Sequence, residues 1–228
     1  MTMQTSYTIP LAIIVGGVIV AGALYFSMAK SPTTDLTIGN PALMQPIRAS
    51  DHILGNPAAK VMIVEYSDFD CEFCKSFHET LHQLVANEGA KGEVAWIFRQ
   101  FPLSEIHPNA LSHAKAAECA AEVGGNDAFW RFADILYANQ PVDPKKYGVL
   151  AKAAGIPGDA FATCYASESA SAPLTERIRS DRQNALDMGA DGTPFSIIVI
   201  TGRPPIVMSG AYSFDAAKQL IDESLTPQ

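Results

Sequence analysis

Two cysteines separated by two residues, Cys71 and Cys74, have the spacing best suited to chemistry in this chain. An apolar, β-branched run, Val61 to Val64, precedes them and is typical of a short buried strand. The segment that follows has helical periodicity up to Val85. A pair of thiols at the start of a helix that follows a strand predicts reversible exchange between a dithiol and a disulfide.

The periodicity of this helix predicts different surroundings for the two thiols. At about 100° per residue, Cys74 lies roughly 50° from the centre of the apolar face, and Cys71 lies about 110° from it. We therefore expect Cys71 to face outward as the nucleophile and Cys74 to be sheltered as its resolving partner. The residues that form the apolar face, and are expected to be buried, are Phe73, Phe77, Leu81, Leu84 and Val85.

The start of a helix also favours the thiolate form of Cys71, because unpaired N–H groups and the positive end of the helix dipole stabilise an anion there. Burial should keep Cys74 protonated. Glu72 places a negative charge beside Cys71 and should raise its pKa. We therefore expect a weaker oxidant than a motif with histidine at one of the two intervening positions.

Two alternatives to a redox pair can be weighed from the sequence. Cys71, Cys74, His78 and His82 are all possible zinc ligands. On a continuous helix, however, about 16 Å of rise separates Cys71 from His82, which is too far for one coordination sphere. The two histidines are instead expected to be half-exposed. A pair of inert core thiols would explain Cys74, but not an outward Cys71.

The 228-residue chain is long enough for one good-sized core plus an anchor or tail. Its formal net charge of −8 argues against nucleic-acid binding, because no basic stripe is available to meet phosphates. The four cysteines suit one active pair plus one further pair.

The N-terminal 50 residues divide into an apolar segment and a polar one. Residues 1–30 contain the apolar run Leu11 to Ala29, which has nearly membrane-spanning length and predicts a transmembrane helix, with a cleaved signal peptide as the alternative. Lys30 lies on the wrong flank for the positive-inside rule, although one charge is weak evidence. Residues 31–50 are typical of a linker, and a domain over 51–225 is expected to begin near Asp51.

The rest of the chain predicts an α/β fold. A second strand is expected at Val94 to Phe98, followed by a helical stretch within about 104–189. Two further strands at Phe195 to Ile200 and Ile206 to Met208 precede a final helix at Phe214 to Ser224. With the helical stretch treated as an insertion, the order of elements is βαβ followed by ββα.

Three stretches in the same order resemble DsbA-like thiol–disulfide oxidoreductases of the thioredoxin superfamily: Glu65 to Cys74, Phe98 to Leu103, and Gly192-Thr193-Pro194. The resemblance implies a thioredoxin fold with an inserted helical domain over nearly the whole region 51–225. It also implies exchange of the Cys71–Cys74 pair with cysteines of exported proteins, without a metal or an organic cofactor.

The resemblance implies roles for three further residues. Thr193 and Pro194 match a pair that ends in a cis proline beside the active-site sulfurs, where the Thr193 backbone is free to pair with a substrate chain. Glu65 matches a buried acid beneath the disulfide, and could exchange a proton with Cys74. The alternative for Glu65 is a partly exposed carboxylate paired with a cation such as Arg99.

Glu72 and Phe73 depart from the Pro-His pair of the best-known oxidases in this family, so the direction of electron flow stays open. A disulfide-forming oxidase is the favoured interpretation. A reductase or isomerase is the second, and a non-redox binding or chaperone module is the third. The resemblance implies a membrane redox partner, such as a quinone-linked reoxidase, and a domain on the extracytoplasmic side of the membrane.

The remaining cysteines, Cys119 and Cys164, both lie in the helical stretch. We expect them to form a structural disulfide, which would imply an oxidising compartment. Two buried free thiols are the alternative.

Overall fold

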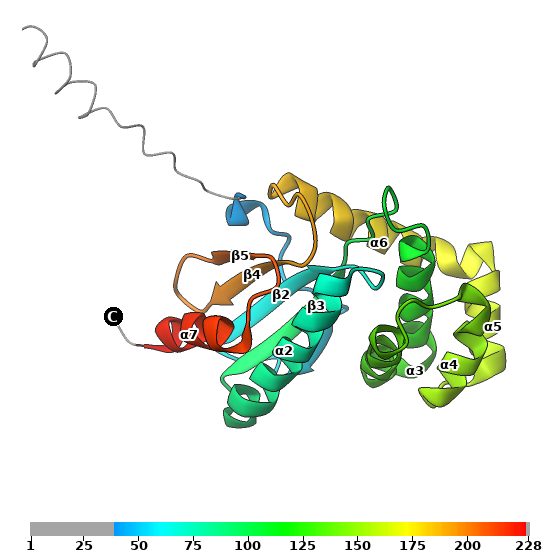
Figure 1. Cartoon of the computed structure of the whole chain (residues 1–228), viewed down its shortest axis with the longest axis horizontal. Helices are drawn as coiled ribbons and strands as arrows, with labels where there is room; N and C mark the ends of the chain where they lie inside the picture. The colour runs from blue at the N-terminus through cyan, green and yellow to red at the C-terminus, as the bar shows by residue number, and fades with distance from the viewer. Residues whose placement is uncertain (1–38, 227–228) are drawn as a thin grey trace, which may run out of the picture. The chain divides into compact units, whose positions relative to one another are not determined.

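A five-stranded sheet forms the centre of the molecule (Figure 1). The computed structural model describes residues 39–226, and the strand order is β1-β3-β2-β4-β5. β2 and β3 pair in parallel, whereas β1–β3, β2–β4 and β4–β5 are antiparallel. The strands are β1 (His52–Gly55), β2 (Val61–Ser67), β3 (Val94–Gln100), β4 (Phe195–Ile200) and β5 (Ile206–Ser209).

The two central strands are covered on both faces. Ile63 of β2 belongs to an apolar cluster with α2 (Glu72–Glu88) and α7 (Phe214–Leu225). The next residue, Val64, belongs to a second cluster that includes residues from the end of α6 (Glu168–Asp187). Because side chains alternate along a strand, an uninterrupted apolar run such as that of β2 fits a strand with helices on both faces.

The helical insertion lies between β3 and β4 (Figure 1). α3 (Ala110–Ala138), α4 (Tyr147–Ala153) and α5 (Gly158–Ala166) pack together beside the sheet, and α6 runs back across one of its faces. A disulfide joins Cys119 of α3 to Cys164 of α5, with their Cα atoms 5.8 Å apart. α3 is interrupted at Gly125, whose φ of 75° is a left-handed conformation that glycine adopts readily. Short 3₁₀ turns are Pro41–Leu43, Gly89–Lys91 and Pro144–Lys146, of which only the last lies in the insertion.

The predicted order of strands and helices is confirmed, with one addition. β1 was not predicted, and it adds an antiparallel edge strand to β3. His52 at its start is 4% exposed because it stacks on Phe129 of α3. Strand β1 is four residues long, so it carries little periodic signal.

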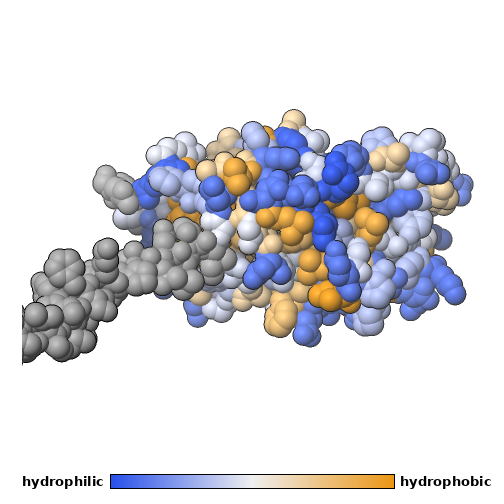
Figure 2. Space-filling model, turned by 90° about the horizontal axis from the view of Figure 1, so that it is seen from above, coloured by the Kyte–Doolittle hydropathy of each residue, from blue (hydrophilic) through white to orange (hydrophobic). Residues whose placement is uncertain are grey.

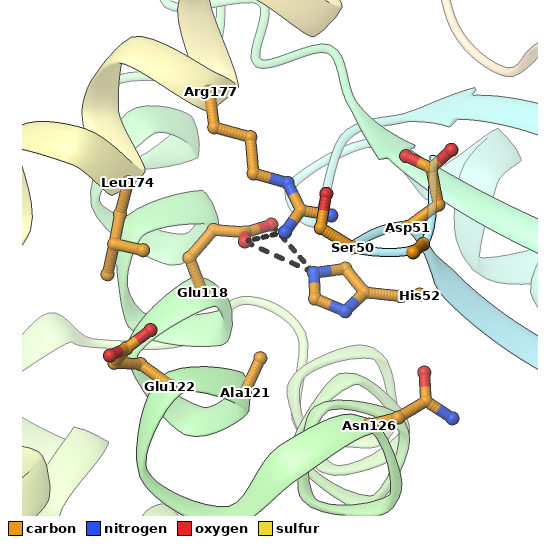
Figure 3. Close-up of a pocket in the computed structure, with 10 residues that line it drawn as sticks. Ser50, Asp51, His52, Glu118, Ala121, Glu122, Asn126, Leu174 and Arg177 are labelled. Atoms are coloured by element: carbon orange, nitrogen blue, oxygen red, sulfur yellow. Dashed lines mark hydrogen bonds and ion pairs between the residues drawn. The ribbon is translucent and has the colours of Figure 1, made fainter. Parts of the chain in front are cut away.

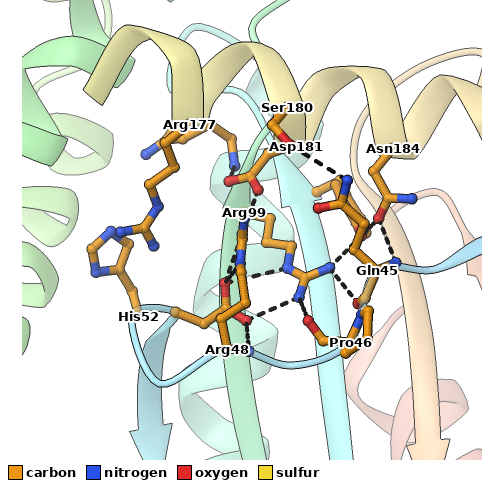
Figure 4. A network of polar contacts seen from close by, with 12 residues as sticks. Gln45, Pro46, Arg48, His52, Arg99, Arg177, Ser180, Asp181 and Asn184 are labelled. Atoms are coloured by element: carbon orange, nitrogen blue, oxygen red, sulfur yellow. Dashed lines mark hydrogen bonds and ion pairs between the residues drawn. The ribbon is translucent and has the colours of Figure 1, made fainter. Parts of the chain in front are cut away.

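The segment before β1 is held to the sheet by a buried polar network (Figure 4). The guanidinium of Arg99 in β3 forms an ion pair with Asp51 at 2.9 Å and donates to the carbonyls of Gln45 and Pro46. Arg48 bridges Asp51 and Asp181 of α6. Arg99 therefore pairs with Asp51, and the predicted alternative of a Glu65–Arg99 pair is wrong.

The described surface mixes hydrophilic residues with smaller apolar patches on the face shown in Figure 2. Within residues 39–226, no helix is both long and apolar enough to cross a membrane. The apolar run Leu11 to Ala29, for which the sequence predicts an anchor, lies outside the described residues.

Candidate active site

The turn after β2 fixes the position of Cys71. Asp68 accepts hydrogen bonds from the backbone N–H groups of Asp70 at 2.8 Å and Leu103 at 2.8 Å through its carboxylate. Its own carbonyl accepts from the N–H of Cys71 at 3.2 Å. These contacts turn the chain out of the sheet, so that Cys71 becomes the N-cap residue of α2.

The two thiols are free and lie at the junction of the turn and the helix. Cys74 is fully buried, and Cys71 is 6% exposed. The Cys71 thiol lies 3.4 Å from the carbonyl oxygen of Thr193, and the Thr193–Pro194 peptide bond is cis. The expectation that Cys71 faces outward is therefore wrong: the segment before β4, 122 residues away in sequence, packs against this side chain.

Cys71 is the more readily ionised of the two cysteines. A hydrogen bond from the Cys74 thiol is the largest influence, and it lowers the pKa of Cys71 to about 6 from an ordinary value of 9.0. Burial opposes this shift, while contacts with Thr193 and with the backbone N–H groups of Phe73 and Cys74 support it. These N–H groups belong to the first turn of α2, in agreement with the stabilisation that a helix start gives to an anion.

Cys74 has the opposite behaviour. Burial raises its pKa well above 9.0, and the nearby charges of Cys71 and Glu65 raise it further. A shared proton explains both shifts, because the Cys74 thiol donates the hydrogen bond that stabilises the Cys71 thiolate. The pair therefore separates into one nucleophilic sulfur and one sulfur that keeps its proton.

Glu65 lies in β2 and is fully buried. Its carboxylate accepts from the Ser67 hydroxyl at 2.7 Å and from the indole N–H of Trp96 at 2.9 Å. Burial raises the pKa of Glu65 to about 8, against the effect of these two hydrogen bonds. The carboxyl group is therefore largely protonated at neutral pH and can give up a proton.

The hydroxyl groups of Ser67 and Tyr137 lie between Glu65 and the cysteines, and neither residue was predicted from the sequence to belong to the site. The Ser67 hydroxyl acts on Cys74 as a hydrogen-bond partner that partly offsets the upward shift of its pKa. It also lies 3.0 Å from the hydroxyl of Tyr137 in α3. The alternation of β2 places Ser67 on the same face as Glu65, which was a usable signal. No comparable signal links Tyr137 to them.

Two acid–histidine pairs flank the turn. His107 lies 2.9 Å from the carboxylate of Asp68, and His113 lies 2.9 Å from that of Asp70. Partial burial opposes charging of His107, but the hydrogen bond with Asp68 and nearby negative charges raise its pKa above 6.5. The cationic form of His107 thus adds positive charge near the Cys71 thiolate.

Two expectations for α2 are wrong. Phe73 was assigned to the buried face but is 61% exposed, since the buried residues of α2 begin one turn later, apart from Cys74. His78 was expected to be half-exposed but is 4% exposed. The rings of Trp96 and Tyr137 pack against it, and Tyr137 comes from the inserted helices.

A polar hollow lies between β1, α3 and α6, away from the two thiols (Figure 3). Its volume is about 240 Å³, and the buried carboxylate of Glu118 meets His52 at 3.0 Å and Arg177 at 3.4 Å. Gln100 also donates to Glu118, at 2.9 Å. This cluster ties the insertion to the edge of the sheet, and its residues are not among those that contact the two thiols.

A dithiol at the start of a helix, on a sheet completed by an antiparallel hairpin, defines a thioredoxin-like protein. A family model described as "Thioredoxin" matches residues 48–223. The chain therefore belongs to the thioredoxin family.

Solved structures share its fold over about four fifths of this chain. The thiol-disulfide exchange protein alpha-DsbA2 from Wolbachia pipientis is 24% identical, with a TM-score of 0.65 over 77% of this chain and 87% of that one. Oxidised BdbD from Bacillus subtilis is 23% identical, with a TM-score of 0.67 over 80% of this chain and 96% of that one. The predicted thioredoxin fold with an inserted helical domain is confirmed.

Curated relatives match only through part of their length. The Na(+)/H(+) antiporter NhaA 3 of Salinispora tropica is 37% identical over 110 residues, which are 46% of this chain and 16% of that protein. NhaA 1 of Mycobacterium sp. (strain KMS) is 30% identical over 192 residues, which are 78% of this chain and 29% of that protein. The chain thus spans less than a third of the length of these relatives.

Proposed function

We propose that this protein is a thiol–disulfide oxidoreductase that uses Cys71 as its nucleophile and Cys74 as its resolving thiol. The observation that carries the proposal is the placement of the two sulfurs: Cys71 caps the start of α2, 3.4 Å from the carbonyl oxygen of Thr193, whereas Cys74 is fully buried. This placement lowers the pKa of Cys71 to about 6 and raises that of Cys74 well above 9.0. A thiolate attacks disulfides, whereas a thiol does not. Electrons pass between sulfur atoms alone, so the exchange needs neither a metal nor an organic cofactor.

In the oxidising direction, a substrate thiolate attacks Sγ of Cys71 in the Cys71–Cys74 disulfide. The sulfur–sulfur bond breaks, the mixed disulfide forms, and Cys74 leaves as a thiolate that takes up a proton. A second substrate thiolate then attacks the substrate sulfur of the mixed disulfide and releases Cys71 as a thiolate. The substrate loses two electrons and gains a disulfide, while the enzyme becomes a dithiol.

Glu65 is the proposed proton donor to the leaving Cys74. Its pKa of about 8 lies below that of Cys74, so the transfer is downhill. The Ser67 hydroxyl, 2.7 Å from the carboxyl group of Glu65, provides a route between them. In the reverse direction, the same carboxylate takes the proton from Cys74 when this thiol attacks a mixed disulfide.

Thr193 and Pro194 are proposed to position the substrate. The Thr193 carbonyl lies 3.4 Å from Sγ of Cys71, so a chain that pairs with this backbone segment brings its own sulfur to Cys71. This edge would then act as a short template for an extended peptide.

The favoured direction is disulfide formation. A low Cys71 pKa stabilises the reduced protein, and this stabilisation makes the disulfide a stronger oxidant. Equilibration with mixtures of reduced and oxidised glutathione measures the reduction potential of the Cys71–Cys74 pair directly. A reduction potential above that of the compartment supports an oxidase, whereas one well below it supports a reductase or isomerase. Thiols that fail to react in the native protein would leave only a binding or chaperone module.

The proposed site of action is the extracytoplasmic side of the membrane, on cysteine-containing exported proteins. The Cys119–Cys164 disulfide supports an oxidising compartment. The run Leu11 to Ala29 supports an N-terminal anchor, and a membrane redox partner such as a quinone-linked reoxidase would restore the disulfide. Alkaline extraction of isolated membranes tests the anchor: an anchored chain stays in the pellet, and a chain cleaved after Ala29 appears in the supernatant.

A further inference from the structure

Two histidines of α2 and one aspartate of α3 bring three ligand atoms together away from the thiols. Nε2 of His78 and Nε2 of His82 each lie 2.8 Å from the same oxygen, Oδ1 of Asp134. The two ring nitrogens are 3.1 Å apart. The three atoms thus form a small triangle of nitrogen, nitrogen and oxygen.

The sequence supplies only part of this arrangement. His78 and His82 are four residues apart and share a helix face. A zinc site that also used Cys71 and Cys74 was excluded by the length of the helix. Asp134 replaces both cysteines, because α3 packs beside α2 and places its carboxylate over the histidine pair.

Protons do not satisfy all three contacts while the aspartate is ionised. If both histidines carry a proton on Nε2, two N–H groups face each other at 3.1 Å. If only one histidine does, the bare nitrogen of the other faces a carboxylate oxygen at 2.8 Å. Hydrogen bonds alone therefore leave one of the three contacts unfavourable in either arrangement.

We propose that His78, His82 and Asp134 bind a divalent transition-metal ion of the zinc type. Nitrogen and oxygen ligands lie about 2.0–2.2 Å from zinc, and tetrahedral angles then separate neighbouring ligand atoms by about 3.3 Å. The observed spacings of 2.8 and 3.1 Å need only a small expansion. A metal cation attracts the lone pairs of all three atoms, whereas a proton in a hydrogen bond joins only two of them.

The surroundings leave the ion accessible on one side. The side chain of His78 is 5% exposed, while those of His82 and Asp134 are 35% and 48% exposed. A hollow of about 160 Å³ beside His78 and Asp134 has room for water as a fourth ligand.

The bound ion would link the helix that carries the dithiol to the inserted domain. His78 follows Cys74 by one turn of α2, and its ring packs on Tyr137, whose hydroxyl lies 3.0 Å from that of Ser67. The metal therefore holds α2 against α3 next to the redox site. Binding should raise the melting temperature, because the unfolded chain does not bring the three ligands together.

The test uses the full, untagged chain with Cys71 and Cys74 oxidised, so that the thiols cannot bind metal. Calorimetric titration with Zn²⁺ is expected to show one ion per chain, and Co²⁺ should give visible absorption bands of a site with few ligands. His82→Gln and Asp134→Asn should each weaken Zn²⁺ binding at least tenfold. Their partly exposed side chains make both variants compatible with folding.

Asp127→Asn is the matched control, since it removes an exposed carboxylate from the same helix and should leave the affinity unchanged. Two results would overturn the proposal. One is an oxidised chain that binds no Zn²⁺ in stoichiometric amount. The other is equal affinity in His82→Gln, Asp134→Asn and the original protein.

Discussion

At the scale of single residues, one hydrogen bond accounts for much of the proposed chemistry. The proton on Cys74 stabilises the thiolate of Cys71, and the burial of Cys74 keeps that proton in place. Cys71 gains further from the N–H groups of the first helical turn. Two identical side chains thus acquire different functions from their places on one helix.

Replacing Glu65 with glutamine tests the proton relay. The amide can still accept from the Trp96 indole, and the Ser67 hydroxyl can rotate to accept from the amide, so the fold should be kept. The steps in which Cys74 gains or loses its proton should slow by about 10²-fold, the lower end of general acid–base effects. Stopped-flow fluorescence of disulfide exchange measures these rates.

The original protein should show a matching dependence on pH. When a substrate dithiol reduces the Cys71–Cys74 disulfide, Glu65 can donate a proton only while it is protonated. The rate of this reaction should therefore fall above about pH 8, where Glu65 ionises. Glu65→Gln should lack this step in the profile. Equal rates and equal profiles in the two proteins would exclude Glu65 as the proton donor.

At the scale of secondary structure, the Cys119–Cys164 disulfide fastens α5 to α3. The bridge closes a loop of 45 residues, so replacing both cysteines with alanine should lower the free energy of unfolding by roughly 4 kcal/mol in the chain-entropy model. Urea denaturation measures the loss. The potential of the Cys71–Cys74 pair should stay unchanged, and a loss of under about 1 kcal/mol would contradict a structural role.

The ion pair between Asp51 and Arg99 anchors the segment before β1. Both side chains are fully buried, so Asp51→Asn leaves the Arg99 charge uncompensated and should cost about 3–5 kcal/mol of stability. Burial opposes ionisation, but contacts with Arg99 and Arg48 lower the pKa of Asp51. Its stabilising effect is therefore present above its ordinary pKa of 3.8 and is lost as the pH falls below this value.

Lys60→Met is the control for Asp51→Asn. It removes a pair with Glu93 in which the lysine side chain is 71% exposed, and should change stability by less than about 1 kcal/mol. Similar losses for Asp51→Asn and Lys60→Met in urea denaturation would contradict the account of the buried pair.

Local patterns predicted the elements, and contacts between distant segments account for what was missed. Periodicity identified α2, β4 and the closing helix, because each depends on its own residues. The cover over Cys71 comes from Thr193, and that over His78 comes from Trp96 and α3. The residues next to Cys71 and His78 in the sequence do not predict either contact. Phe73 was misplaced because a helical wheel does not show where a neighbouring element stops.

At the scale of the whole molecule, the ionisation of Cys71 links folding stability to redox state. The folded dithiol form loses the Cys71 proton near pH 6, whereas the unfolded chain keeps it up to about 9. The reduced protein should therefore gain stability relative to the oxidised protein as the pH rises from 6 to 9, by at most about 1.4 kcal/mol per pH unit.

Urea denaturation of both redox forms at several pH values checks this expectation. Glu65 and the buried ion pairs are present in both forms, so their contributions largely cancel in the difference. A Cys71→Ala variant has no thiol to ionise at this position and forms no disulfide with Cys74, so its stability should follow the same pH dependence as that of the oxidised protein. A stability difference that stays constant between pH 6 and 9 would contradict the assigned ionisation.

The most direct test of the account is the titration of Cys71 in the reduced native protein. The rate of alkylation by iodoacetamide, followed by mass spectrometry at each cysteine, reports the ionisation of each thiol separately. We expect a midpoint of about 6 for Cys71 and no alkylation of Cys74 below pH 9. A Cys71 midpoint near its ordinary value of 9.0, or faster reaction at Cys74, would contradict it.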